Sequence, residues 1–206
     1  MHLSEGVLNP SVLLGGAVLA AIGVAVGLRG LDERRLSLTA LFGAVFFVAG
    51  TIHIPVGLGS VHLILNGIAG LFLGYAVFPA FLIALILQVF LFSFGGFAVL
   101  GINLLILAVP ALVTHALFSK CLWQNQTDKK YLSVLVGICC GIIGVGGSAL
   151  LASVTLIVNG GKHADDLIGL LLITHFPVFV IDSLVSCGIL LVFNKMQPQD
   201  FSSYKV

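Results

Sequence analysis

Seven apolar segments separated by short breaks constrain this chain more than any other feature of its sequence. A helix needs about 20 apolar residues to cross the hydrocarbon core of a bilayer. Only 8% of the residues are charged and 59% are hydrophobic, against about 25% and 45–50% in soluble domains. The sequence therefore excludes a water-soluble fold and predicts an all-α integral membrane protein, a single domain over residues 1–206 with about seven transmembrane helices. The predicted helices cover residues 10–28, 36–54, 61–77, 79–94, 97–118, 131–158 and 167–193.

The basic residues indicate how these helices are oriented. Lys and Arg gather on the cytoplasmic side of membrane proteins. With seven spans and the N-terminus outside, Lys162 alone lies outside, and the C-terminus is cytoplasmic. Six or eight spans would place the later basic clusters on the wrong side. The eight residues that this topology places inside are Arg29, Arg34, Arg35, Lys120, Lys129, Lys130, Lys195 and Lys205.

Several other properties follow from composition and from missing motifs. The net charge of +1 suggests no nucleic-acid partner. The sequence has no G-x-x-x-x-G-K-[ST] motif for ATP, so we expect no ATPase site and no enzymatic activity. The four cysteines lack C-x-x-C spacing and are expected to be small core residues. The first residues lack the basic region of a signal peptide, so we expect a mature N-terminus.

The first two residues form a candidate metal chelate. A free amine on Met1, the peptide nitrogen of His2 and its Nδ1 can close fused rings on one metal, which leaves one position of a square plane. Square-planar nitrogen donors suit Ni(II), Cu(II) and low-spin Co(II), whereas Zn(II) prefers a tetrahedron. The alternative is that His2 is an exposed terminal residue without a role.

The N-terminal sequence also resembles a known family. Its first six residues are similar to the N-terminal signature of the cobalt/nickel-specific S components of energy-coupling factor (ECF) ABC transporters, the CbiM/NikM family. The similarity is carried by motifs in the first half of the chain, and the second half matches in hydropathy and topology alone. These motifs are Met1-His2-Leu3-Ser4-Glu5-Gly6, Ile52-His53-Ile54-Pro55, Gly59-Ser60-Val61-His62-Leu63, Phe94-Gly95-Gly96 and Leu100-Gly101-Ile102-Asn103.

The resemblance implies a function and a metal site. A capping segment, residues 1–9, would enter the bundle, and Met1, His2 and His62 would bind the metal. The chain would capture Co²⁺ or Ni²⁺ outside a prokaryotic cytoplasmic membrane for ATP-driven uptake, serving cobalamin biosynthesis, with no permanently bound cofactor. Its partners would be a transmembrane coupling subunit, ABC-type ATPases and a small accessory membrane subunit. Val61 replaces the Gly of the nickel-type context, so cobalt is the first choice and nickel the second.

Two further groups of residues, one near this site and one on the first helix, each have more than one possible role. His53 would hydrogen-bond a metal ligand or bind the ion on its way into the site. The alternative is a histidine at the membrane interface that bonds to the backbone. Asn66 lies four residues after His62, on the same face of the predicted helix, so it would orient that ring or bond another helix. A small-residue face on the first helix would contact the coupling subunit or pack within the bundle. It consists of Gly16, Ala20, Gly23 and Gly27.

The last helix carries ionisable residues of unassigned role. His175 and Asp182 would form a proton relay, or pair with Asn103, Thr114 and His115 of the fifth helix. His163, Asp165 and Asp166 would cap a helix or attract cations. Two other functions stay open: a stand-alone metal channel or proton-coupled carrier, and an intramembrane protease built on Ser148 and His175.

Overall fold

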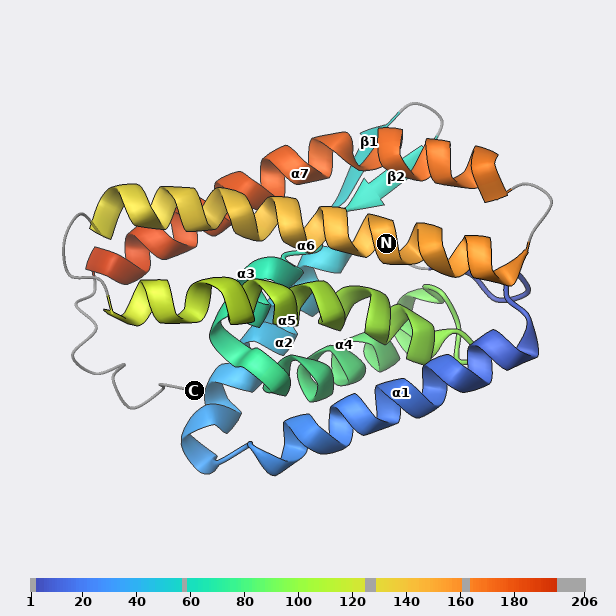
Figure 1. Cartoon of the computed structure of the whole chain (residues 1–206), viewed down its shortest axis with the longest axis horizontal. Helices are drawn as coiled ribbons and strands as arrows, with labels where there is room; N and C mark the ends of the chain where they lie inside the picture. The colour runs from blue at the N-terminus through green and yellow to red at the C-terminus, as the bar shows by residue number, and fades with distance from the viewer. Residues whose placement is uncertain (1–2, 57–58, 125–128, 161–163, 196–206) are drawn as a thin grey trace.

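The apolar segments fold into a bundle of helices interrupted by one β-hairpin (Figure 1). The computed structural model describes residues 3–56, 59–124, 129–160 and 164–195. Within these ranges the elements are α1 Pro10–Arg29, α2 Glu33–Thr51, β1 His53–Val56, β2 Gly59–His62, α3 Asn66–Leu73, the 3₁₀ turn η1 Gly74–Ala76, α4 Val77–Phe92, α5 Leu100–Gln124, α6 Lys129–Asn159 and α7 Ala164–Lys195.

The prediction of a helical membrane bundle is confirmed in its main feature. Among the described residues, five helical stretches are long and apolar enough to cross a membrane, and the apolar part of α2, Arg35–Thr51, is shorter. The number of passes and their orientation stay predictions. The five stretches are Pro10–Arg29, Asn66–Phe92, Leu100–Lys120, Lys130–Asn159 and Thr174–Lys195.

The chain differs from the prediction between residues 52 and 77. The predicted helices 36–54 and 61–77 would have included His53 and His62, but both residues lie in the β-hairpin. The helix that follows has only eight residues, so a full-length third span is wrong. The predicted break at Phe78, between the predicted helices 61–77 and 79–94, is also misplaced, because this residue belongs to α4. The break lies instead at Gly74, whose φ of 55° is a conformation that glycine adopts without steric cost.

The short helix α3 lies at the centre of the molecule. All eight of its residues are buried, and it packs mainly against α5 and α6. Helix α7 runs along α6 (Figure 1). The buried groups include polar side chains such as Asn66, Asn103 and Asp182, while many large apolar side chains, among them Leu14 and Phe90, are exposed. Polar side chains buried within a largely apolar core, together with an apolar exterior, are the arrangement expected in a bilayer.

The small-residue face of α1 packs inside the bundle. Gly16, Ala20 and Gly27 are buried. A Cβ added to Gly16 would lie 2.2 Å from Ile102 Cδ1, one on Gly23 2.4 Å from Phe78 Cε1, and one on Gly27 2.4 Å from the Tyr75 carbonyl oxygen. These contacts favour packing within the bundle for Gly16, Ala20, Gly23 and Gly27, because this face contacts α4, η1 and α5 of the same chain. Contact of this face with a coupling subunit stays a prediction.

Candidate functional site

The β-hairpin brings two candidate histidines opposite each other. Strands β1 and β2 are antiparallel, and His53 is the register partner of His62. Residues that face each other in an antiparallel pair have Cα atoms about 4.5–5.5 Å apart. A sequence signal for the hairpin exists in Gly57-Leu58, since a two-residue connection that begins with Gly suits a tight turn between strands. His53 is thus a neighbour of His62 through strand pairing, not through a turn between two helices.

The ring of His62 has a defined hydrogen bond on one side. Its Nδ1 lies 2.9 Å from the Leu63 carbonyl oxygen, and the residue is half-buried. A carbonyl oxygen can only accept, so Nδ1 carries the proton and the lone pair of the neutral ring is at Nε2. A histidine whose one nitrogen is bonded to a backbone carbonyl and whose other nitrogen faces a metal is the common arrangement in metal sites.

The N-terminal segment is fixed at Leu3 by a buried asparagine of α5. Leu3 N–H donates to Asn103 Oδ1 at 2.8 Å, and Asn103 Nδ2 donates to the Leu3 carbonyl at 3.1 Å. Asn103 is 2% exposed. Met1 and His2 lie outside the described residues. The residue that follows them is therefore bound to the bundle interior through its backbone. The motif that contains Asn103 is visible in the sequence, but its partner is not.

A second attachment is made by Glu5 at the Phe94-Gly95-Gly96 motif. Glu5 N–H donates to the Gly95 carbonyl at 3.3 Å, and Glu5 Oε1 accepts from Ala98 N–H at 3.0 Å. Gly96 has a φ of 133°, and a Cβ there would lie 2.3 Å from Glu5 Cδ. The motif thus provides the space that the Glu5 side chain occupies.

A third attachment joins Asn9 to the end of α6. Asn9 N–H donates to Asn159 Oδ1 at 2.6 Å, Asn9 Nδ2 donates to the Asn159 carbonyl at 3.0 Å, and Asn159 Nδ2 donates to the Val7 carbonyl at 2.8 Å. Residues 3–9, which we call the N-terminal strap, are therefore bound to α5, to the α4–α5 loop and to α6.

Asn66 connects the first turn of α3 to α5 and α6. Its Nδ2 lies 2.9 Å from the Leu107 carbonyl oxygen, 3.3 Å from that of Gly144 and 2.9 Å from Ser148 Oγ. It follows an irregular segment and shares no helix with His62, so the prediction of a common helical face is wrong. These contacts match the helix–helix alternative.

Pro110 explains why Ser148 takes part in this junction. Proline has no N–H, so Pro110 leaves the carbonyl of Ile106 without its helical donor. The Ser148 hydroxyl donates to that carbonyl at 2.9 Å and accepts from Asn66. Ser148 is fully buried and bonded to these two groups rather than to His175, so the Ser148–His175 protease dyad is wrong.

The strap and the His62 region attach to adjacent turns of α5. Asn103 binds Leu3, and the carbonyl of Leu107 accepts from Asn66, four residues after His62. Residues i and i+4 of a helix lie on one face, about 6 Å apart along the axis. Helix α5 therefore holds the residue after His2 and the residues after His62 on one surface.

Asp182 of α7 binds the segment between His62 and α3. Its carboxylate accepts from Leu65 N–H at 2.8 Å and from Ile64 N–H at 3.4 Å. Leu65 has a φ of 51°, a left-handed conformation that costs a non-glycine residue about 1–2 kcal/mol. The predicted pairing of Asp182 with Asn103, Thr114 or His115 is wrong, because its partners are these backbone amides.

The other candidate residues of α5 and α7 have partners elsewhere. The Thr114 hydroxyl donates to the Pro110 carbonyl at 3.0 Å, and His115 Nδ1 lies 3.0 Å from the Leu71 carbonyl oxygen. His175 is buried, with Nδ1 3.3 Å from the Thr174 hydroxyl. Asp165 and Asp166 belong to the first turn of α7, and His163 lies outside the described residues.

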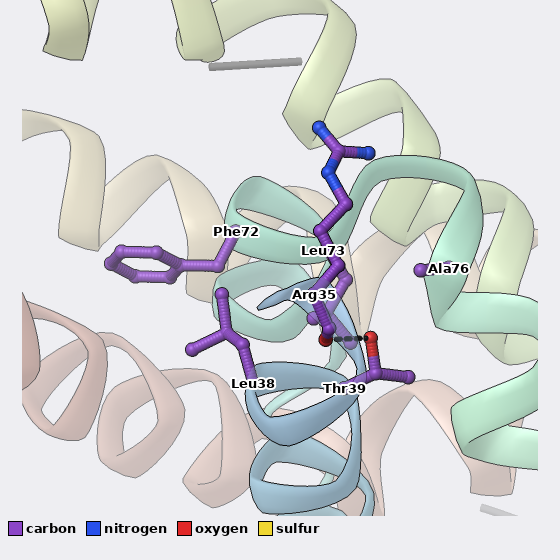
Figure 2. Close-up of a pocket in the computed structure, with 6 residues that line it drawn as sticks. All are labelled: Arg35, Leu38, Thr39, Phe72, Leu73 and Ala76. Atoms are coloured by element: carbon purple, nitrogen blue, oxygen red, sulfur yellow. Dashed lines mark hydrogen bonds between the residues drawn. The ribbon is translucent and has the colours of Figure 1, made fainter. Parts of the chain in front are cut away.

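A small pocket lies away from the hairpin, near the start of α2 (Figure 2). It holds about 10 Å³, which is room for one water at most. Figure 2 shows the Thr39 hydroxyl bonded to the Arg35 carbonyl at 2.8 Å on its wall. The positive charge of Arg35 makes this pocket a poor place for a metal cation. Within the described ranges, no three His, Cys, Asp or Glu side chains converge as ligands.

Comparison with known proteins identifies the class. A family model described as the cobalt uptake substrate-specific transmembrane region, CbiM, matches residues 2–199. A putative metal transport protein of Haemophilus influenzae is 61% identical over 199 residues, covering 97% of this chain and 96% of that protein. The fused nickel transport protein NikMN of Rhodobacter capsulatus is 31% identical over 164 residues, or 75% of this chain and 46% of that protein.

Two solved structures have the same fold. A truncated transition metal transporter has a TM-score of 0.77 at 18% identity and covers 96% of this chain and 100% of its own. A second transition metal transporter has a TM-score of 0.76 at 19% identity, with 95% and 93% covered.

Fold, buried polar groups and family match together define a multi-pass membrane component of cobalt or nickel transport. The chain belongs to the CbiM family.

Proposed function

We propose that this chain is the substrate-capture subunit of an ECF-type ABC transporter, and that it binds Co²⁺, or Ni²⁺ as second choice, from outside the cell. The ligands would be the Met1 amine, the His2 peptide nitrogen, His2 Nδ1 and His62 Nε2. Four nitrogens in a plane suit both ions. The metal is the transported substrate, and no resident cofactor is proposed.

The observation that carries this proposal is the reciprocal pairing of Leu3 with Asn103. A free chain end ordinarily stays in water, because burying its polar groups is costly. Here the backbone of Leu3 has buried partners, and the next turn of α5 binds the residues after His62. Both contacts favour a shared site for the chain end and His62.

The hairpin supports an additional role for His53. Its pairing with His62 suits a residue that orients a ligand or hands the ion to the site. We propose His53 for one of these roles and leave Asn66 as a support of α3.

The partners and the compartment belong to the same proposal. The coupling subunit, the ATPases and a small accessory membrane subunit would supply the energy and complete the path, since the sequence has no P-loop. The membrane would be the prokaryotic cytoplasmic membrane, with uptake serving cobalamin biosynthesis. The first turns of α2 and α6 lie at the same end of the bundle as the last turns of α1, α5 and α7 (Figure 1). This gathering of basic termini supports a cytoplasmic orientation of that end.

Equilibrium binding of Co(II) and Ni(II) to the purified protein tests the site. One residue added before Met1 displaces the amine from the chelate and leaves every side chain intact. It should weaken binding about 100-fold, or roughly 2.7 kcal/mol, as should His62→Ala. The matched control is one residue added after Val206. Equal affinity of the N-terminally extended protein and the control would eliminate the amine as a ligand.

The partner assignment has its own test. The purified chain alone, reconstituted in liposomes, should bind metal without ATP-driven accumulation, and accumulation should need the coupling subunit and ATPases. ATP-dependent uptake by the isolated chain would contradict the assignment.

A further inference from the structure

Asp182 is an acidic side chain inside the bundle, and it binds one short segment, Ile64–Leu65. The residue is 2% exposed. Within the described part of the chain, its hydrogen-bond partners are the N–H groups of Leu65 and Ile64. Burying a carboxylate is expensive unless it is compensated, and two backbone N–H groups compensate a full charge only in part. A divalent cation close by would add the remaining compensation.

The segment that Asp182 holds follows directly from His62. Leu63 accepts the hydrogen bond of the His62 ring, and the next two N–H groups bind the carboxylate. Leu65 is kept at a φ of 51°, and α3 begins at the following residue. The segment is thus fixed by the imidazole at one end and by α7 at the other. Strain of this kind, next to a candidate ligand, is typical of functional sites.

The anionic form of the side chain matters for this geometry. A carboxylate has two acceptor oxygens and can bind both N–H groups, each oxygen taking one, as observed here. An amide of the same shape has one acceptor oxygen and an NH₂ group, which would face the second N–H with the wrong polarity. An asparagine at this position would therefore release one end of the segment.

We propose that Asp182 is the positioning residue for His62, acting through residues 63–65, and that its negative charge favours a divalent cation at the ring. This inference rests on the proposed function, because it takes His62 as a metal ligand. It goes beyond a plain helix cap, which would stabilise α3 without affecting the metal.

The experiment combines two substitutions in a cycle. Asp182→Asn, His62→Ala and the double variant are prepared with an authentic N-terminus, and Co(II) affinity is measured at equilibrium on the folded fraction. Loss of a group that orients a metal ligand typically costs 10–100-fold in affinity. We expect about this loss for Asp182→Asn in the wild-type background and a clearly smaller loss in the His62→Ala background, where only the charge of the carboxylate still acts. The matched control is Ser186→Ala, a buried position one turn along α7, for which affinity should be unchanged.

A second measurement reports on the segment without metal. Hydrogen–deuterium exchange of the metal-free protein should be faster over residues 62–66 in Asp182→Asn, and unchanged there in Ser186→Ala. If Asp182→Asn does not fold, Asp182→Glu replaces it. This variant keeps the charge and displaces it by one methylene, and we expect a several-fold loss of affinity.

The outcomes separate the two proposals. Unchanged Co(II) affinity in the folded Asp182→Asn protein, or in Asp182→Glu where that variant is used, overturns this inference alone. Equal losses in the presence and absence of His62 also overturn it, because Asp182 would then act independently of the ring. Wild-type affinity in His62→Ala overturns the proposed site and this inference together.

Discussion

Leu3 and Asn103 exchange two hydrogen bonds, at 2.8 and 3.1 Å, so that the side-chain amide of α5 pairs with the backbone of the strap as a neighbouring strand would. The pair lies one helical turn from the carbonyl that binds Asn66. It links the chain end to the centre of the bundle, and the other two attachments of the strap lie further along the segment.

Asn103→Leu should release the first residues of the strap. The substitution keeps the side chain's volume and removes both bonds, which leaves the N–H and the carbonyl of Leu3 without their partners. We expect a loss of about 1–3 kcal/mol in the free energy of unfolding. The loss in the free energy of Co(II) binding should be larger than this loss of stability. Gln88→Leu is the control, because Gln88 is an equally buried amide whose Nε2 bonds to Phe47 of α2. Equal metal affinities in the two variants would contradict the role given to Asn103.

Gly96→Ala should displace Glu5. The added Cβ would lie 2.3 Å from Glu5 Cδ, and alanine is strained at a φ of 133°. We expect a cost of about 1–3 kcal/mol, measured by thermal unfolding in detergent, and faster proteolysis of the strap. Adding Glu5→Ala should recover the part of the stability loss that comes from the clash with Glu5. The part that comes from backbone strain at residue 96 should remain. Gly188→Ala serves as the control, since nothing lies within 4 Å of its added Cβ.

The attachments of the strap and the β-hairpin are the parts of the structure that could not be predicted from the sequence. The length of the apolar runs locates α1 and α5–α7, because each is a long run between polar or glycine-rich breaks. It misses the hairpin because the apolar residues around His53 and His62 merge with the neighbouring helical runs. Residue types at the site are predictable, since His62 and Asn103 belong to motifs. Their partners are not, because Leu3 and Leu63 act through backbone groups that every residue has.

The face of α1 illustrates a second limit. In a membrane, a helix face that packs inside a bundle and one that meets lipid or a partner are both apolar, so hydropathy does not distinguish them. Small residues indicate close approach of another helix, but they do not say from which chain that helix comes. Here Gly16 and Gly27 approach α5 and α4 of the same chain.

The Pro110–Ser148 relationship predicts non-additive effects on stability. Ser148→Ala removes the donor for the Ile106 carbonyl and should cost about 0.6 kcal/mol and at most about 1.7 kcal/mol, the average and the maximum measured for hydrogen bonds between membrane helices. Pro110→Ala restores a backbone N–H that can donate to the same carbonyl. In that background, the part of the Ser148→Ala loss that belongs to the Ile106 bond should disappear. A double-mutant cycle on unfolding free energies measures this coupling. Additive losses would show that the freed carbonyl is not the reason for the serine.

Metal affinity should fall as the pH is lowered. The proposed ligands bind as a neutral amine, a deprotonated peptide nitrogen and two neutral imidazoles, so each ligand that carries a proton must release it. Free imidazole and α-amino groups ordinarily lose their protons between about pH 6 and 8. The free protein therefore binds more protons than the complex throughout this range, and affinity must rise with pH. We expect Co(II) binding to be weaker at pH 6 than at pH 8 by about fourfold for each imidazole of ordinary pKa and by about 30–50-fold for the α-amino group. His62→Ala should show a shallower dependence, because it lacks the roughly fourfold change that one imidazole contributes over this interval. The measurement is the slope of the logarithm of affinity against pH, and a wild-type slope in this variant would remove His62 from the ligand set.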